Sequence, residues 1–178
     1  MELKIVKFFN KFGRGTALDF VTDFVTRILY LAFFWTLATI MIFFFAENGR
    51  MIAMALTIAA SLHFLISEGV FKYLLRKYFM RTRPYIAYPQ EIFPIGRKHG
   101  DSSFPSSHMS ANLSVLTVLV YFYPGVLWFA ISFVVLTAFA RLHNGMHYPF
   151  DIIAGTILGI LYGIVGINFA GFIVNILF

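Results

Sequence analysis

Histidine, serine and aspartate side chains gather in two short stretches of the chain whose spacing suits phosphate chemistry. Ser106, Ser107 and His108 stand at the start of an apolar stretch. If a helix begins there, its first backbone N–H groups are unpaired donors that favour an anion. Further along, His147 and Asp151 are four residues apart, so on a helix the carboxylate can reach the imidazole. A carboxylate in that place fixes the imidazole tautomer and raises the basicity of the other ring nitrogen.

Three arginines add planar guanidinium groups, which fit the oxygens of a phosphate. Arg76 and Arg83 lie in one polar segment, and Arg141 closes a later apolar stretch. Phosphoryl transfer needs cations for the equatorial oxygens, an in-line nucleophile and an acid for the leaving oxygen, and these residues supply all three. The chain has no Cys and eight acidic residues, most of them far apart, so we predict neither a metal site nor another cofactor.

Three motifs carry a resemblance to the type-2 phosphatidic acid phosphatase (lipid phosphate phosphatase) superfamily, whose relatives include the vanadium haloperoxidases. The family signatures are Lys-x6-Arg-Pro, Pro-Ser-Gly-His and Ser-Arg-x5-His-x3-Asp. This chain reads Arg76-x6-Arg83-Pro84, Pro105-Ser106-Ser107-His108 and Ala140-Arg141-x5-His147-x3-Asp151. One motif alone is a weak signal, but three with matching spacings across residues 76–151 are a strong one.

Three positions depart from the family signatures. Arg76 replaces the leading Lys, while Lys77 lies one position out of register, and we prefer Arg76 on register and charge. Ser107 replaces a Gly, which keeps the backbone N–H donor, and Ala140 replaces a Ser hydroxyl.

The resemblance implies a mechanism without a divalent metal. His147 would be the nucleophile that forms a phosphohistidine, oriented by Asp151. His108 would protonate the leaving group and then activate water. The phosphoryl oxygens would be held by Arg76, Arg83, Arg141, the Ser106 hydroxyl and the Ser107 backbone.

The composition places this chemistry in a membrane. The 178 residues are 60% hydrophobic and 12% charged, about half the roughly 25% charge of a soluble domain. This excludes a water-soluble globule, a disordered tail and a disulfide scaffold. We predict an all-α polytopic transmembrane bundle, a single domain over 1–178, with about five spans. The expected spans are 28–46, 51–71, 109–123, 126–142 and 152–167, the last with an extension towards Phe178.

Two segments outside the spans have distinct characters. Residues 1–27 begin with alternating Lys and apolar side chains, too short and charged to cross, and we predict an interfacial amphipathic helix followed by an amphipathic lead-in. Family members often have six spans, so the resemblance implies that this segment replaces the first. Residues 76–107 are polar and rich in Pro, and a connection of that length is usually functional, so we predict the active-site loop there.

Five spans would put the N-terminal segment, the loop 76–107 and residues 141–151 on one face. That face holds or borders every Lys and Arg except Arg50. The positive-inside rule would therefore make that face cytoplasmic. Members of the family usually face the periplasm. We expect the site to lie on the periplasmic face, because Lys and Arg residues that bind phosphate add to the number of positive residues there without setting the topology.

The resemblance implies a bacterial inner-membrane lipid phosphatase acting on a phosphate monoester or diphosphate. Lipid A 1-phosphate is our first choice, on overall likeness. Undecaprenyl diphosphate, phosphatidylglycerophosphate and phosphatidic acid are the alternatives. A lipid-to-lipid phosphotransferase and a non-catalytic lipid-binding protein are candidates of other classes. The expected partners are the phosphorylated lipid and the bilayer, and not nucleic acid, because too little polar surface exists to carry a basic face.

The remaining ionisable residues have simpler interpretations. We expect His99 and Asp101 to be solvated loop residues that shape the entrance, and His143 to be an interfacial neighbour. Glu68 could pair with Lys72 at i+4, although an ionisable group inside a span, like His63, is a functional candidate by default. Glycines at 155, 159 and 163 predict close helix packing.

Overall fold

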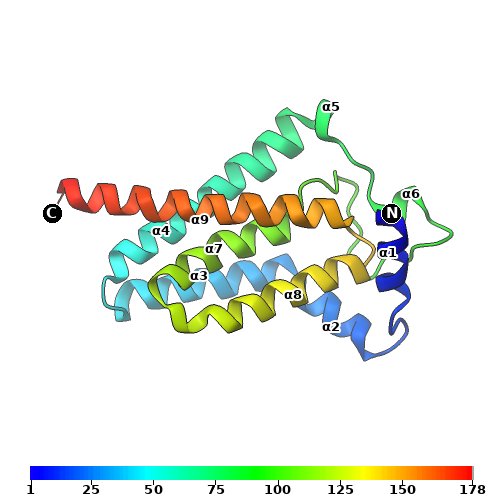
Figure 1. Cartoon of the computed structure of the whole chain (residues 1–178), viewed down its shortest axis with the longest axis horizontal. Helices are drawn as coiled ribbons and strands as arrows, with labels where there is room; N and C mark the ends of the chain where they lie inside the picture. The colour runs from blue at the N-terminus through cyan, green and yellow to red at the C-terminus, as the bar shows by residue number, and fades with distance from the viewer. Residues whose placement is uncertain (178) are drawn as a thin grey trace.

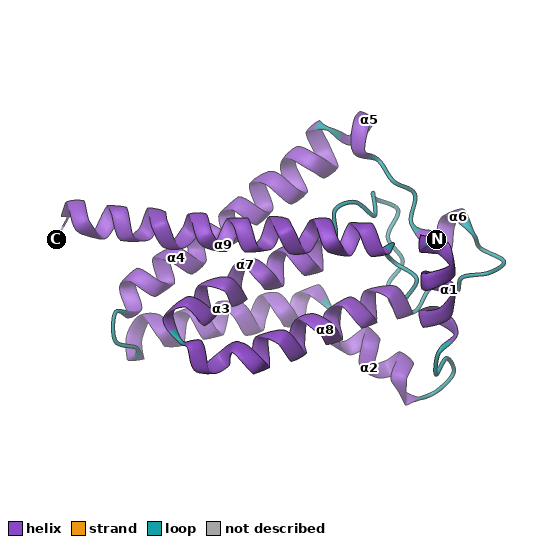
Figure 2. Ribbon diagram, in the orientation of Figure 1, coloured by secondary structure: helices purple, strands orange, loops and turns teal. Residues whose placement is uncertain are grey.

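The computed structural model describes residues 1–177, with side chains to residue 176, and every regular element in that part of the chain is a helix (Figure 2). Phe178 lies outside the described residues. Five helical rods run along the long axis and place the N- and C-termini at opposite ends (Figure 1). They are α3 (Ile28–Phe45), α4 (Gly49–Leu62) continued by the π-helix η1 (His63–Leu74), α7 (Ser107–Phe122), α8 (Leu127–His143) and α9 (Pro149–Leu177). The predicted all-α bundle is confirmed.

Four of the five rods are long and apolar enough to cross a bilayer by themselves. These stretches are Ile28–Phe45, Gly49–Leu74, Pro124–His143 and Pro149–Ile176. The fifth, α7, has 16 residues, a length of about 24 Å against a hydrocarbon core of roughly 30 Å. More than half of its residues are buried, and it packs against α9, α4 and α8. The structure therefore differs from the expectation of five spans in one respect: α7 is a short central helix surrounded mainly by protein.

Glycines let α9 approach α7 closely. A Cβ added at Gly159 would lie 2.7 Å from the Leu113 Cβ, and one at Gly163 would lie 2.5 Å from the Thr117 Cβ. A Cβ at Gly155 would lie 2.5 Å from a backbone oxygen at the start of α7. The predicted role of these glycines in close helix packing is confirmed, because no larger side chain fits these contacts without a shift.

Polar hydrogen bonds tie the outer helix α3 to the centre of the bundle. Trp35 is the buried residue of α3, and its Nε1 donates to Asn112 Oδ1 on α7 at 2.9 Å. Asn112 Nδ2 in turn donates to Thr137 Oγ1 on α8 at 3.4 Å. Side-chain hydrogen bonds between helices are a usual means of association where lipid removes the hydrophobic driving force.

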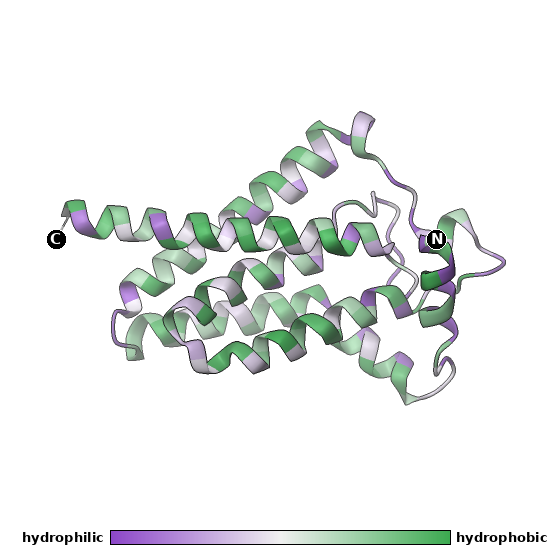
Figure 3. Cartoon of the chain, viewed as in Figure 1, coloured by the Kyte–Doolittle hydropathy of each residue, from purple (hydrophilic) through white to green (hydrophobic). Residues whose placement is uncertain are grey.

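Two amphipathic helices, α1 (Glu2–Lys11) and α2 (Ala17–Val25), lie at the loop end of the bundle, where the polar residues gather (Figures 1 and 3). The predicted N-terminal helix forms, and it is docked on protein. Asn10 Nδ2 donates to the carbonyl oxygens of His143 and Phe93, and Asn10 Oδ1 accepts from the Phe93 N–H. His143 is buried between α1 and α2, with Nδ1 2.9 Å from the Phe9 carbonyl oxygen and Nε2 2.9 Å from Asp19 Oδ1. This histidine holds the N-terminal helices against α8.

The long polar connection between η1 and α7 is mostly irregular, as its prolines predict. It contains two single-turn helices, α5 (Arg76–Phe79) and α6 (Pro84–Ala87), the second with Pro84 in its first turn. A three-residue helix η2 (Pro124–Val126) joins α7 to α8 at the opposite end. The loop therefore covers the end of the bundle at which α7 begins and α8 ends.

Candidate active site

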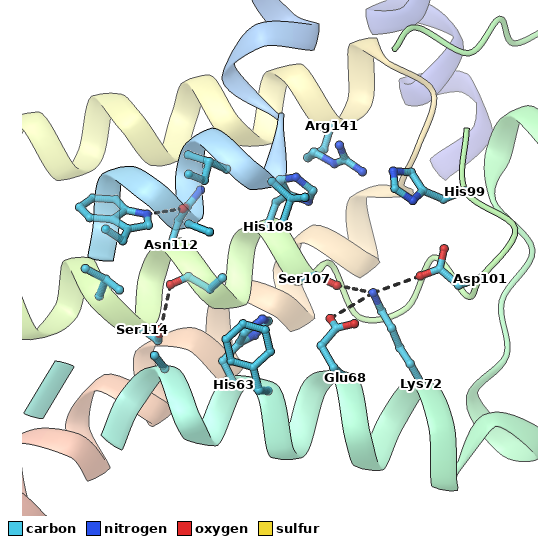
Figure 4. Close-up of a pocket in the computed structure, with 18 of the residues that line it drawn as sticks. His63, Glu68, Lys72, His99, Asp101, Ser107, His108, Asn112, Ser114 and Arg141 are labelled. Atoms are coloured by element: carbon cyan, nitrogen blue, oxygen red, sulfur yellow. Dashed lines mark hydrogen bonds and ion pairs between the residues drawn. The ribbon is translucent and has the colours of Figure 1, made fainter. Parts of the chain in front are cut away.

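A cavity of about 430 Å³ opens at the loop end of the bundle, between α3, η1 and α7 (Figure 4). Its polar end carries side chains from five separate parts of the chain. Its deeper end is apolar and includes Leu31, Ala32 and Val115. The ionisable and hydroxyl residues of the lining are Thr36, His63, Glu68, Lys72, Arg83, His99, Asp101, Ser107, His108, Ser114, Arg141 and His147.

His147 lies buried in the turn between α8 and α9, with both ring nitrogens engaged. Its Nδ1 is 2.7 Å from the Ser103 carbonyl oxygen, which can only accept, so Nδ1 carries the proton. Its Nε2 therefore holds the lone pair, and it faces Arg141 Nη2 at 3.1 Å and Arg83 Nη1 at 3.4 Å. Burial, with the charges of Arg141 and Arg83, lowers the pKa of His147 well below its ordinary value. The imidazole is thus neutral near pH 7 and suited to act as a nucleophile.

Asp151 is close to His147 but does not make the expected hydrogen bond. Asp151 Oδ2 is 3.8 Å from His147 Nδ1 and accepts the Tyr148 N–H at 2.9 Å, while Oδ1 accepts from Arg81 Nη1 at 2.8 Å. The physical reason is competition for hydrogen bonds. The Arg81 guanidinium and the Tyr148 N–H donate to the carboxylate, and the Ser103 carbonyl oxygen accepts the hydrogen bond from His147 Nδ1. Asp151 is fully buried, and its carboxylate remains within 4 Å of His147 Nδ1.

Arg81 is a residue that the sequence interpretation did not assign to the site. Besides Asp151, it binds Glu2 of α1 through Nη2 at 2.5 Å, and its guanidinium lies over the Tyr148 ring. Burial opposes the charged form, but the two carboxylates raise the pKa of Arg81 further. A signal was present in the sequence, because Arg81 and Arg83 are two residues apart in a segment without helical structure. Arg81 contacts Asp151, and Arg83 contacts His147.

The first turn of α7 brings Ser107 and His108 to the cavity wall, whereas Ser106, the residue before the helix, does not line the cavity. His108 is buried, and its Nε2 is 2.8 Å from the Thr26 carbonyl oxygen at the α2–α3 junction. The Ser106 N–H donates to the Asp151 carbonyl oxygen, and the buried Ser106 Oγ has no hydrogen-bond partner among the described residues. Ser107 Oγ contacts Lys72 Nζ (Figure 4).

The structure brings two of the three expected arginines together. Arg83 and Arg141 are 3% and 4% exposed, and both face His147. Arg76 and its alternative Lys77 lie on α5, are exposed, and do not line the cavity. The arrangement does not support the prediction that either one is the leading cation, because both lie past Leu74, where η1 ends.

Lys72 occupies the place expected for Arg76. Its side chain is 10% exposed, and Nζ lies 3.2 Å from Glu68 Oε1 and 3.5 Å from Asp101 Oδ2 (Figure 4). The i→i+5 hydrogen bonds of a π-helix bring residues four and five apart onto one face. His63, Glu68 and Lys72 therefore all line the cavity. The predicted Glu68–Lys72 pair forms, but it forms inside the site.

Asp101 and His99 line the cavity, and the Asp101 side chain is 46% exposed, as expected of a loop residue at the entrance. Asp101 Oδ1 accepts from Arg83 Nη2 at 2.7 Å. Burial raises the pKa of Asp101, but the charges of Arg83 and Lys72 outweigh this and hold it below its ordinary value. Burial also lowers the pKa of His99, as does the Arg83 charge. Asp101 thus orients two of the cavity's cations.

The cavity holds the neutral imidazole of His147 beside two guanidiniums, three further imidazoles, an ammonium, two carboxylates and an apolar recess. Within the described residues, no three His, Cys, Asp or Glu side chains gather as a metal ion would need. A phosphoryl group at His147 Nε2 would meet Arg83 and Arg141, and an attached apolar chain would extend towards α3. A model of the PAP2 superfamily matches residues 51–173, which run from α4 to α9 and include these groups.

The chain belongs to the PAP2 superfamily. Among its relatives is the undecaprenyl-diphosphatase BcrC of Bacillus subtilis (strain 168), 25% identical over 157 residues, 88% of this chain and 77% of that protein. Another is the lipid A 4'-phosphatase of Bacteroides thetaiotaomicron, 26% identical over 169 residues, 89% of this chain and 72% of that protein. The crystal structure of Aquifex aeolicus LpxE shares the fold, with a TM-score of 0.72, 21% identity and 94% of each chain covered.

Membership confirms the resemblance drawn from the three motifs. This PAP2 protein is a multi-pass membrane protein of a family of lipid phosphate phosphatases, in agreement with its apolar helices. The relatives' names differ in the lipid, so the family and the substrate are separate questions.

Proposed function

We propose that this protein removes a phosphate from a membrane lipid through a phosphohistidine on His147, without a divalent metal. The observation that carries the proposal is the position of His147 Nε2, which is unprotonated and faces Arg141 and Arg83 in a cavity with an apolar recess. Guanidiniums that are fixed before the reaction stabilise the charge of the transferring phosphoryl group.

The proposed reaction has two steps. In the first, His147 Nε2 attacks phosphorus, the bond from phosphorus to the lipid oxygen breaks, and His108 gives that oxygen a proton. In the second, a water oxygen attacks phosphorus, the phosphorus–nitrogen bond breaks, and His108 takes the proton from the water. Asp151 supports the positive charge of the phosphorylated imidazole. Lys72, Arg83, Arg141, Ser106 and Ser107 surround the phosphoryl oxygens.

The lipid is either a monophosphate or a diphosphate. Lipid A 1-phosphate is the first substrate to test, and undecaprenyl diphosphate is the main alternative. One relative carries the name of a lipid A 4'-phosphatase, which supports lipid A as the lipid, and another that of an undecaprenyl-diphosphatase, which supports the alternative. Phosphatidylglycerophosphate and phosphatidic acid complete the panel. We propose that the protein acts in the bacterial inner membrane with its site on the periplasmic face.

The deciding experiment assays purified protein in detergent micelles against these four lipids, with the release of free phosphate followed continuously. Wild-type protein should release phosphate from at least one lipid. His147→Ala should release none while it remains folded, because the nucleophile is lost. A His147→Ala protein that turns over would contradict the assignment of the nucleophile.

The same assay tests the metal and the reaction class. Phosphate release should continue in EDTA, because Lys72, Arg83 and Arg141 supply the positive charge. Loss of activity in EDTA with recovery in Mg²⁺ would refute the metal-free mechanism. Transfer of phosphate to an added lipid alcohol, in place of free phosphate, would indicate a phosphotransferase.

A further inference from the structure

A second cavity, of about 400 Å³, adjoins the first at His108, the proposed acid and base. It lies between the α2–α3 junction and loop residues 95–99. His99, His108 and Arg141 line both cavities, whereas His147 lines the first alone. The wall between the two cavities therefore contains the group that must activate water.

The two cavities differ in chemistry. The recess of the first cavity is apolar, whereas the rim of the second carries Asp23, Arg27 and Arg97. Arg27 pairs with Asp23 at 2.8 Å, and its side chain is about half exposed. An apolar recess suits a lipid chain, and a charged, exposed rim suits water and a small anion.

Buried polar atoms along the second cavity lack partners within the described chain. Asn144 is 1% exposed, and its Nδ2 donates to Thr26 Oγ1 and to the Thr22 carbonyl oxygen, while its Oδ1 accepts no hydrogen bond from any described group. Arg141 Nε is a buried donor in the same condition. Both residues line the cavity, as does Thr26, whose carbonyl oxygen binds His108. Buried polar atoms normally have a hydrogen-bond partner, and water can be that partner for both Asn144 Oδ1 and Arg141 Nε.

We propose that the second cavity brings water to the phosphohistidine and releases orthophosphate, while the lipid alcohol still occupies the first cavity. The proposal rests on the proposed function. Water passes Asn144 and reaches His108, which takes its proton as the oxygen attacks phosphorus and the bond to His147 breaks. Orthophosphate then leaves past Arg141 and Arg97. Hydrolysis thus does not wait for the lipid product to return to the bilayer.

The absence of Cys from the chain allows this passage to be blocked chemically. Arg97→Cys places the single thiol on the rim of the second cavity, and Lys98→Cys places it on the next residue, which lines neither cavity. Each protein is assayed before and after reaction with pyrene maleimide. The substrate is the lipid from the panel that gives the fastest phosphate release. Rapid quenching measures lipid alcohol, free phosphate and protein-bound phosphate.

Labelled Arg97→Cys should form lipid alcohol in a burst approaching one per protein and accumulate protein-bound phosphate, while free phosphate slows by about tenfold or more. Labelled Lys98→Cys should behave as it does before labelling. Loss of the burst in labelled Arg97→Cys would overturn the proposal, since the cavity would then serve the lipid. An unchanged rate of free phosphate would overturn it as well. If wild-type protein itself never binds phosphate covalently, the proposed function fails first, and the proposal fails with it.

Discussion

At the residue scale, the site consists of an imidazole whose lone pair is held between two guanidiniums. Arg83 and Arg141 are almost fully buried, so their charges act on His147 Nε2 with little screening by solvent. Ser103 contributes only its backbone, yet its carbonyl oxygen decides which nitrogen of His147 carries the proton. A backbone acceptor of this kind gives no signal in side-chain spacing.

The cation that leads the first motif can be tested directly. Lys72→Ala should reduce kcat/KM by about 10- to 100-fold, because a hydrogen bond to a charged group contributes about 1.5–3 kcal/mol. Arg76→Ala, on the exposed α5, should change kcat/KM by less than about threefold. Phosphate release from both proteins, measured side by side, checks this. A larger loss of kcat/KM in Arg76→Ala than in Lys72→Ala would show that the motif register identifies the leading cation correctly.

The pH dependence of His147, the proposed nucleophile, follows from its environment. Because burial, Arg141 and Arg83 lower the pKa of His147, its neutral form persists below the ordinary histidine value and is lost only as the pH falls through the lowered value. The acid limb of kcat/KM should therefore lie below pH ~6.5. Arg83→Gln removes one cation, so its acid limb should move to higher pH. Lys72, His108 and Asp151 also face His147 and are retained in that variant, and a limb that stays in place would contradict this account.

At the element scale, the sequence predicted which segments are helical better than it predicted their roles. The apolar stretches and the Gly155, Gly159 and Gly163 repeat foretold the rods and the α7–α9 contact, because both depend on local composition. The π-helical form of η1 was not foreseen; η1 carries Lys72 to the cavity, whereas Arg76 lies beyond its end, on α5. The Arg81 bridge from Asp151 to Glu2 joins residues far apart in the chain, so no motif spacing contains it.

The α7–α9 contact offers a matched pair of stability variants. Gly159→Ala puts a Cβ 2.7 Å from the Ser110 carbonyl oxygen and the Leu113 Cβ, so the helices must separate. The cost should be about 1–3 kcal/mol, as for other overpacked cores. Gly171→Ala meets no atom within 4 Å and should leave the melting temperature unchanged or slightly raised. Thermal unfolding of both variants is measured in the same detergent. Equal melting temperatures would show that α7 and α9 can move apart at little cost in stability.

At the scale of the whole molecule, the sequence predicted that the candidate site residues lie at one end of a membrane bundle, and the structure gathers most of these side chains at that end. The sequence could not show that the end is closed by α1 and α2, because Asn10 and His143 make those contacts through backbone carbonyls. Nor could it show two cavities meeting at His108, since that depends on how the loop folds back over the helices.

The orientation in the membrane is tested with single cysteines at opposite ends of the bundle. Lys98→Cys lies in the loop beside the site, and Arg50→Cys lies at the start of α4, and both positions are exposed. In intact cells, an impermeant maleimide should label Lys98→Cys and should label Arg50→Cys only after the membrane is permeabilised. The reverse pattern would mean that the positive-inside rule holds and the site faces the cytoplasm.

The two guanidiniums that converge on one imidazole also have a thermodynamic consequence. Arg83 has Asp101 as a counter-ion, whereas Arg141 has no carboxylate within ion-pair distance among the described residues. The fold therefore holds unbalanced like charges in a region of low polarity. Orthophosphate should relieve that repulsion and so act as a folding ligand, adding about 2.7 kcal/mol of stability at a concentration of one hundred times its Kd. Storage buffers that contain phosphate would then preserve the protein and compete with its substrate at the same time.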